Sequence, residues 1–228
     1  MTAAPPRIDG RSARSARTRD AVVEAFLALI DGGNLRPTAR EVSERANVSL
    51  RSVFQHFADL ETLFAVAADL QVERLAALAR RIPADLPFEE RLAAFTDARA
   101  KLLEAITPVR RAALLQEPFS PELASRLAWA RDTNRAELRA LFAGEIASRP
   151  EGERAALLAA LDVATNWYAW ETLRRHNGLS EEDARAVLRL SIAALLGERN
   201  EETGDLKLAR SARPVSSFHS PVSPKEAR

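Results

Sequence analysis

Residues 37–57 have the sequence PTAREVSERANVSLRSVFQHF, and this stretch predicts two short helices joined by a tight turn. Thr38 can accept a hydrogen bond from the backbone N–H of Glu41, and the Glu41 carboxylate can reach back to the Thr38 backbone, which is the spacing of a capping box. Asn47 suits the left-handed residue that ends many helices, and Ser49 can cap the helix that follows. Two helices of roughly eight residues joined by three or four residues have the proportions of a helix-turn-helix.

Amphipathic segments lie on both sides of this pair of helices. Apolar residues recur three and four positions apart over residues 22–30, and Gly33 follows where a C-cap is expected. We therefore expect a helix that begins at Thr18. After the pair, Asp59 can cap a long helix that we expect to continue to Arg81.

The rest of the chain, as far as Leu196, also has helical periodicity. The expected helices are 88–106, 109–116, 121–147, 151–177 and 181–196. Thr107-Pro108 is expected to separate the first two of these, because proline removes a backbone donor inside a helix. The sequence thus predicts an all-α fold.

The composition and the motifs exclude several classes of protein. The chain has no Cys, which excludes a disulfide scaffold, a thiolate metal site and a cysteine nucleophile. His56, His176 and His219 are far apart and in no metal-ligand spacing, and there is no GxSxG, HExxH, P-loop or GxGxxG motif. We therefore expect no metal, no cofactor and no enzymatic activity. Because there is neither a secretory signal nor an apolar run of membrane-spanning length, we expect a cytoplasmic protein without membrane contact.

The nearly balanced charge, 33 Lys and Arg against 32 Asp and Glu, is unevenly distributed along the chain. Residues 1–57 hold nine Arg and six carboxylates, whereas residues 58–197 hold 18 basic and 21 acidic residues. Five of the arginines fall within residues 1–19, where Asp9 is the one acidic residue. This N-terminal arm is either a solvated terminus or a cationic segment that contacts DNA phosphates or a minor groove.

The second helix of the pair can present side chains that bind DNA bases. If Val53 and Phe57 face the core, the remaining positions are exposed. These positions are Leu50, Arg51, Ser52, Phe54, Gln55 and His56. Arg and Gln can bond base edges, Ser and His can reach phosphates, and Leu or Phe can contact a thymine methyl. The alternative is a helical protein-interaction module that does not bind DNA.

Residues 18–64 resemble the N-terminal domain of TetR-family transcriptional regulators. The resemblance rests on Thr18-Arg19-Asp20, Gly33, Pro37-Thr38-Ala39-Arg40-Glu41-Val42, Ala46-Asn47-Val48-Ser49, Val53-Phe54-Gln55-His56-Phe57 and Leu63-Phe64. The chain departs from the family pattern at Phe54, where the family usually has Tyr, at Leu60, where Lys is usual, and at Asn47, where Gly is common.

The resemblance implies a DNA-binding site in the helix-turn-helix and the arm. The residues expected to contact DNA are Arg14, Arg17, Thr38, Ala39, Arg40, Ser49, Leu50, Arg51, Ser52, Phe54, Gln55 and His56. Two of these have a structural alternative: Arg40 can pair with Glu44 four residues on, and His56 can pack beside Phe57.

The resemblance also implies an N-terminal three-helix helix-turn-helix DNA-binding domain and a C-terminal helical ligand-binding and dimerisation domain. We place a basic flexible arm at 1–17, the DNA-binding domain at 18–64, the effector-binding and dimerisation domain at 65–197 and a disordered tail at 198–228. The implied function is a ligand-responsive homodimeric repressor whose partners are a palindromic double-stranded DNA operator, a second copy of the chain and an unidentified small-molecule effector.

Residues of the C-terminal half are candidates for two further sites. The candidates for the effector pocket are Phe64, Phe95, Arg99, Leu103, Trp129, Thr133, Asn166 and Trp167. The candidates for the dimer interface are Leu161, Tyr168, Leu188, Ile192 and Leu195, because the last two expected helices carry apolar residues on more than one side. The alternative is that these are buried core helices. For the aromatic pocket candidates, the alternative is an ordinary position in the core.

Overall fold

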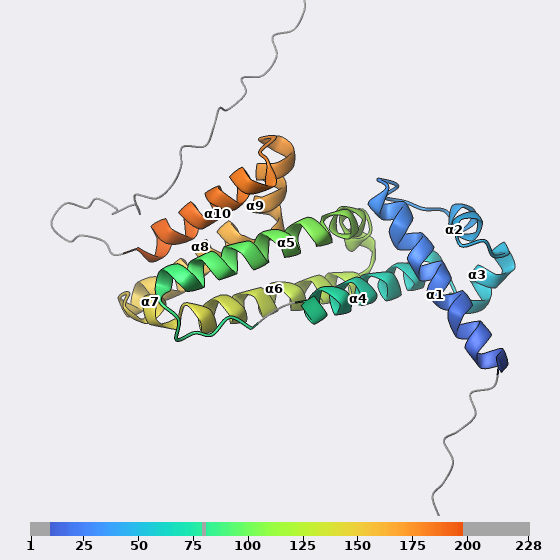
Figure 1. The fold of residues 1–228 in the computed structure, drawn as a ribbon, viewed down its shortest axis with the longest axis horizontal. Coiled ribbons are helices and arrows are strands. Elements are labelled where there is room, and N and C mark those ends of the chain that lie inside the picture. Colours follow the sequence, from blue (N-terminus) through green and yellow to red (C-terminus); the bar gives the residue numbers. More distant parts are fainter. Residues whose placement is uncertain (1–9, 79–80, 198–228) are drawn as a thin grey trace, which may run out of the picture. The chain divides into compact units, whose positions relative to one another are not determined.

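The computed structural model describes residues 10–78 and 81–197, and within these ranges it contains helices and no strand (Figure 1). The chain divides into two compact units. Of the described residues, the first unit holds 10–78 and 105–127, and the second holds 81–104 and 128–197. The all-α prediction is therefore confirmed. No helix of the described chain is long and apolar enough to cross a membrane.

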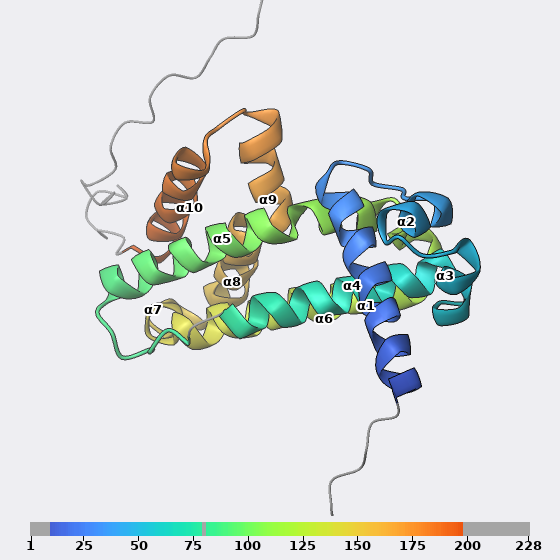
Figure 2. The same ribbon diagram turned by 45° about the vertical axis from the view of Figure 1, so that its right-hand side comes forward.

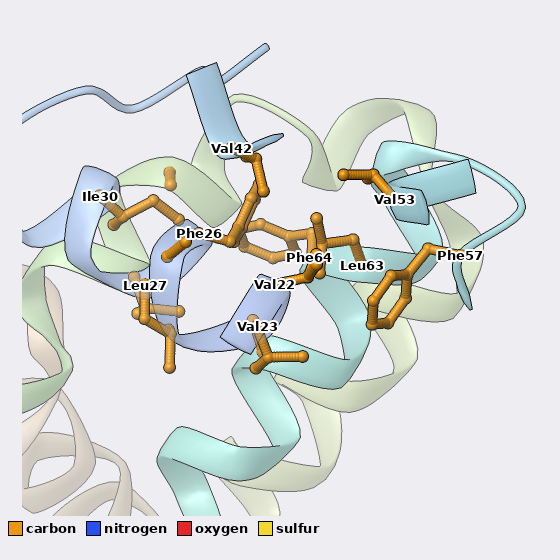
Figure 3. Close-up of a cluster of buried hydrophobic side chains, with 14 of the residues drawn as sticks. Val22, Val23, Phe26, Leu27, Ile30, Val42, Val53, Phe57, Leu63 and Phe64 are labelled. Atoms are coloured by element: carbon orange, nitrogen blue, oxygen red, sulfur yellow. The ribbon is translucent and has the colours of Figure 1, made fainter. Parts of the chain in front are cut away.

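The first unit contains α1 (Gly10–Asp31), α2 (Ala39–Arg45), α3 (Leu50–His56) and α4 (Leu60–Leu78). Helix α1 packs against each of the other three, and α2 packs against α3. The core is formed by apolar side chains that these helices direct toward one another, as Figure 3 shows. They include Val22, Phe26 and Ile30 of α1, Val42 of α2, Val53 of α3, and Leu63 and Phe64 of α4. This core fixes the orientation of the helix-turn-helix.

The ends of α2 and α3 are stabilised by the caps that the sequence predicts. Thr38 and Glu41 form both hydrogen bonds of the capping box. Asn47 has a φ of 53°, in the left-handed region, and the hydroxyl of Ser49 accepts a bond from the backbone N–H of Ser52 at 3.1 Å. The carboxylate of Asp59 accepts a bond from Thr62 N–H at 2.7 Å at the start of α4. These four local predictions are confirmed.

The N-terminal arm differs from the prediction, because α1 begins at Gly10 and not at Thr18. Alanine and arginine are strong helix formers, and no proline interrupts the segment, so the helix extends through Arg14 and Arg17. Thr18 donates to the carbonyl of Arg14 at 3.1 Å within this helix. Residues 1–9 of the expected arm and the expected tail at 198–228 lie outside the described residues.

The expected break at Thr107-Pro108 is also wrong, because α5 runs without interruption over Phe88–Leu114. Proline at position 108 removes the bond to the carbonyl of Glu104, but the rest of the helix remains anchored. Gln71 of α4 donates to the neighbouring carbonyl of Ala105 at 3.2 Å. Buried side chains beyond the proline, such as Ala112, hold the second half of the helix in the core of the first unit. The short 3₁₀ helix η1 (Glu117–Phe119) follows α5.

The second unit has more helix breaks than the sequence predicts. Instead of one helix over 121–147 there are α6 (Pro121–Leu141) and α7 (Ala143–Ala147), with Phe142 between them. The ring of Phe142 is buried and packs edge-on against Phe95, with 5.7 Å between the centroids. Arg91 donates to the carbonyl of Leu141 at 2.5 Å, which provides a partner for a backbone group at the end of α6.

A second break divides the helix expected over 151–177. The structure has α8 (Glu151–Thr165), α9 (Trp167–Glu171) and a π-helical turn, η2 (Thr172–His176). Asn166 has an extended backbone, and its side-chain oxygen accepts a bond from Ala169 N–H at 3.0 Å, which caps α9. The last helix, α10 (Glu181–Leu196), packs against α8 and contacts η2 (Figure 2). It begins with Ser180 as its cap, as expected.

Candidate nucleic-acid interface

Helix α3 is fixed on the first unit by its inner face. Val53 and Phe57 are buried in the core, and Phe57 lies directly after the last turn of α3. The guanidinium of Arg19 lies 5.4 Å from the centroid of the Phe57 ring, a distance at which a cation is attracted to an aromatic face. The sequence did not predict this contact of Arg19, because no local spacing relates it to Phe57. These contacts give α3 a defined orientation.

The outer face of α3 combines two apolar and two polar side chains. Leu50 and Phe54 are 45% and 50% exposed, and they lie four residues apart on the same side of the helix. Arg51 and Gln55 are also exposed and form a parallel pair with the same spacing. The guanidinium of Arg51 can bond guanine O6 and N7, and the amide of Gln55 can bond adenine N6 and N7. The apolar pair can contact thymine methyl groups.

Ser49, Ser52 and His56 lie at the two ends of α3. Ser49 and Ser52 bond each other through their hydroxyls at 2.8 Å, at the N-terminal end of α3. His56 is half-buried at the other end, which agrees with its structural alternative and still leaves part of the imidazole accessible.

Helix α2 lies next to α3 and presents the remaining candidates of the helix-turn-helix. Thr38 is exposed, Ala39 is half-buried and Arg40 is exposed. The Nε of Arg40 bonds Glu44 at 2.8 Å, and with 83% of its side chain exposed the guanidinium can leave this pair for a phosphate or a base. The hydrogen bond and the charge of Glu44 raise the pKa of Arg40, so Arg40 stays cationic.

Arg14 and Arg17 lie on the first turns of α1. Both side chains are exposed, and neither has an ion-pair partner among the described residues. Cations held on a helix, three residues apart, can contact successive backbone phosphates. The structure thus brings Thr38, Ala39, Arg40 and the α3 residues together on two packed helices, and it places the two arginines on a helix that packs against both.

The candidates for the effector pocket fall into different environments. Phe64 is buried in the first unit, where its ring meets Phe26 edge-on. In the second unit Phe95, Leu103 and Trp167 are buried. Trp129 and Thr133 are exposed, and the Thr133 hydroxyl bonds the carbonyl of Trp129 within its own helix. The side-chain oxygen of Asn166 is used as the cap of α9.

A buried polar cluster surrounds the remaining candidate, Arg99. Its Nη2 bonds Glu137 at 2.5 Å, its guanidinium lies 4.9 Å from the centroid of the Phe95 ring, and burial lowers the pKa of Arg99. Asn134 donates to Asp162 at 2.8 Å, and the charge of Asp162 also acts on Arg99. The Nε of Arg99 and the Oδ1 of Asn134 are buried without a hydrogen-bond partner. Such atoms are a place for a bound water or a polar ligand group.

The candidates for the dimer interface need a correction. Leu161, Leu188 and Ile192 are at most 2% exposed within the single chain, so they are core residues and cannot contact a second copy in this conformation. Leu195 is half-buried, and Tyr168 is exposed. The sequence shows that these helices are apolar on several sides, but it does not show which side packs inside the protomer.

Other apolar residues of α8 and α10 are exposed, and together they are called the exposed apolar face. It consists of Ala156, Ala159 and Val163 on α8 and Ala186 and Leu190 on α10. Val163 is 64% exposed and Leu190 is 37% exposed, and each group follows helical spacing along one side of its helix. The sequence does not reveal this face, because small residues such as alanine contribute little to an apolar pattern.

Among the described residues, no group of three or more His, Asp or Glu side chains is arranged to hold a metal ion.

The fold is similar to that of known transcriptional regulators. A transcriptional regulator from Rhodococcus sp. Rha1 matches with a TM-score of 0.61 and 22% identity, over 80% of this chain and 95% of that one. A candidate TetR-family transcriptional regulator from Mesorhizobium loti matches with a TM-score of 0.53 and 19% identity, over 80% and 96% of the two chains. No protein-family model and no curated protein matches the sequence. At these identities the likeness concerns the fold.

Proposed function

We propose that this protein is a sequence-specific DNA-binding transcriptional regulator, a ligand-responsive homodimeric repressor of a palindromic operator that acts in the cytoplasm. The observation that carries the proposal is the outer face of α3. Arg51 and Gln55 project from a helix whose opposite face is buried in the core, and a capped α2 lies beside it. Polar side chains on the outer face of the second helix of a helix-turn-helix are suited to the major groove.

The exposed arginines of the first unit also support DNA as the partner. Arg14, Arg17 and Arg40 are exposed next to the helices that carry the base-contacting residues. Phosphate contacts from such side chains supply affinity without sequence preference, whereas Arg51 and Gln55 supply the preference. Binding is therefore expected to be specific and to weaken strongly as the salt concentration rises.

The exposed apolar face of α8 and α10 supports the homodimer. Large apolar side chains such as Val163 and Leu190 favour burial, and the small alanines beside them allow two helices to approach closely. Two such helices from each of two copies would form a four-helix contact with two-fold symmetry. A two-fold dimer presents two copies of α3, and a palindromic site with half-sites about 34–36 Å apart fits that symmetry.

The buried cluster around Arg99 supports a ligand response in the second unit. Leaving a buried polar atom without a partner costs on the order of 1–3 kcal/mol, and a ligand that supplies an acceptor to Arg99 and a donor to Asn134 would remove this cost. A ligand of this kind changes DNA binding only if it favours one of two conformations of the protein.

The experiment that tests the proposal is a selection of duplexes from random-sequence DNA with the full chain. We expect a dyad-symmetric site that is bound at low salt and released at high salt. If no sequence is enriched over several rounds at low salt, the chain is a helical interaction protein and the proposal is wrong.

A further inference from the structure

The first unit contains a cavity of about 380 Å³ that the proposed function does not use. It lies between the first turns of α4 and the start of α6, two segments that run side by side in Figures 1 and 2. Its volume is within the range of about 300–1,000 Å³ that is typical of small-molecule sites. The cavity is separate from the Arg99 cluster, since all its lining residues belong to the first unit.

The wall of this cavity is acidic. It includes the carboxylates of Asp59, Glu61 and Glu122, and Arg126 is the one cationic side chain among the lining residues. Arg126 is already neutralised, because it bonds both Glu122 at 3.0 Å and Asp69, and it also donates to the carbonyl of Ala65 at 3.2 Å. The charges of Asp59 and Glu61 therefore face the cavity without a compensating cation in its lining.

These two carboxylates are accessible. Asp59 accepts the backbone N–H of Thr62, and this bond lowers the pKa of the Asp59 carboxyl. Glu61 is exposed, and its side chain has neither a hydrogen-bond nor an ion-pair partner among the described residues. A ligand with a positive charge would meet a preformed negative potential here.

The rest of the lining combines apolar side chains with the uncharged polar side chains of Thr62, Gln116 and Ser120. The buried side chains of Phe64 and Leu123 form part of the cavity lining. Phe64 and Leu123 can contact the apolar part of a small ligand.

We propose that this cavity binds a small organic cation, an amine or a quaternary ammonium group attached to an apolar body. Carboxylates on one wall bind the charge, while Phe64 and Leu123 contact the apolar part. The site is also connected to the DNA-binding surface through the backbone, because α4 begins only four residues after α3 ends. A cation held against Asp59 and Glu61 would bias the position of α3. This effect on DNA binding rests on the proposed function, whereas the binding of the cation does not.

Binding is tested by calorimetry on the full chain with three aromatic probes of similar size. The probes are benzyltrimethylammonium, benzyl alcohol and phenylacetate. We expect the cation to bind about tenfold more tightly than the neutral alcohol, and phenylacetate not to bind. Equal binding of the cation and the alcohol, or no binding of the cation at millimolar concentration, would overturn the proposal.

A matched pair of variants locates the binding. Glu61→Gln removes one charge and keeps the side-chain shape, and we expect it to weaken benzyltrimethylammonium binding about threefold. Glu73→Gln changes an exposed carboxylate of the same helix outside the cavity lining and should leave binding unchanged. Equal effects of the two substitutions would show a nonspecific charge effect and overturn the site. Both side chains are exposed, so both variants should fold, which a melting curve checks.

The link to DNA is measured separately. Benzyltrimethylammonium should change the affinity of the full chain for its selected duplex, and Glu61→Gln should reduce that change. If the cation binds with the expected pattern and the DNA affinity does not change, the regulatory role is wrong. If the chain without the cation binds no duplex at all, the proposed function is wrong. The cation site is then judged by the calorimetry alone.

Discussion

Thr38 and Glu41 illustrate how single residues determine the start of α2. The Thr38 N–H bonds the Glu41 carboxylate at 2.8 Å, and the Glu41 N–H bonds the Thr38 hydroxyl at 3.3 Å. Asn34 also donates to the Glu41 carboxylate at 3.2 Å. These donors, chiefly the bonds from Thr38, lower the pKa of the Glu41 carboxyl below its ordinary value of 4.5. The spacing of Thr38 and Glu41 alone predicts this exchange, so the sequence is sufficient at this position.

The lowered pKa predicts a dependence of stability on pH. A carboxyl whose pKa is lower in the folded state stabilises the fold above the unfolded-state pKa, and this contribution disappears as the pH falls through the folded-state value. Glu41→Ala should therefore reduce the melting temperature at pH 7, and the difference from wild type should shrink below pH 4.5. Glu73→Ala serves as the control. A difference that is constant between pH 7 and pH 3 would contradict this assignment.

The exposure of Phe54 leads to a prediction about the base that it contacts in the DNA. Because this side chain is half-exposed on the outer face of α3, we expect it to contact a thymine methyl in the operator. Replacing the contacted thymine with uracil removes one methyl, worth about 0.8 kcal/mol or nearly fourfold in affinity. The loss should appear with wild type and vanish with Phe54→Ala. Titrations of both duplexes with both proteins measure this coupling, and equal losses would show that Phe54 contacts no methyl.

At the scale of elements, the sequence predicted helix starts better than helix breaks. The caps at Thr38, Ser49 and Ser180 are local, so three or four residues are enough to identify them. The break at Asn166 has a local cap from its own side chain, whereas the break at Phe142 depends on long-range contacts. The buried ring of Phe142 interacts with Phe88 and Phe95, which lie far away in the sequence. Periodicity within one helix does not contain this information.

The extension of α1 leads to a prediction about salt. Each phosphate that a cation neutralises adds about 0.9 to the slope of the logarithm of affinity against the logarithm of salt concentration. Arg14→Ala together with Arg17→Ala should thus reduce the slope by about 1.8 per protomer, with little change in the preferred sequence. Anisotropy titrations at several salt concentrations measure the slope. An unchanged slope would mean that this turn of α1 does not contact DNA.

For the whole molecule, the main correction concerns the surface for self-association. The sequence suggested Leu161, Leu188 and Ile192, but these side chains form the core of the second unit. A helix that is apolar on two sides does not reveal which side packs within its own chain. The distinction requires the tertiary structure, which leaves Val163 and Leu190 exposed instead.

The exposed apolar face of α8 and α10 predicts that the protein is a dimer. Wild type should sediment as a dimer, and Leu190→Arg should sediment as a monomer, because a charge in an apolar contact loses hydration without gaining a partner. Val72→Arg changes another half-exposed apolar residue, on α4, and should leave the dimer intact. If Leu190→Arg remains a dimer in analytical ultracentrifugation, the interface lies elsewhere.

The central claim is that the outer faces of α2 and α3 bind DNA, and it is tested most directly by the affinity of one variant. Arg40→Ala, Arg51→Ala and Gln55→Ala are combined, and binding to the selected duplex is compared with wild type and with Arg139→Ala, which replaces an exposed arginine of α6. All three side chains are exposed, so the fold should be retained. We predict a loss of roughly 100-fold or more for the triple variant, since each base contact contributes about 1–3 kcal/mol, and no loss for the control. An affinity of the triple variant equal to that of wild type would contradict the account.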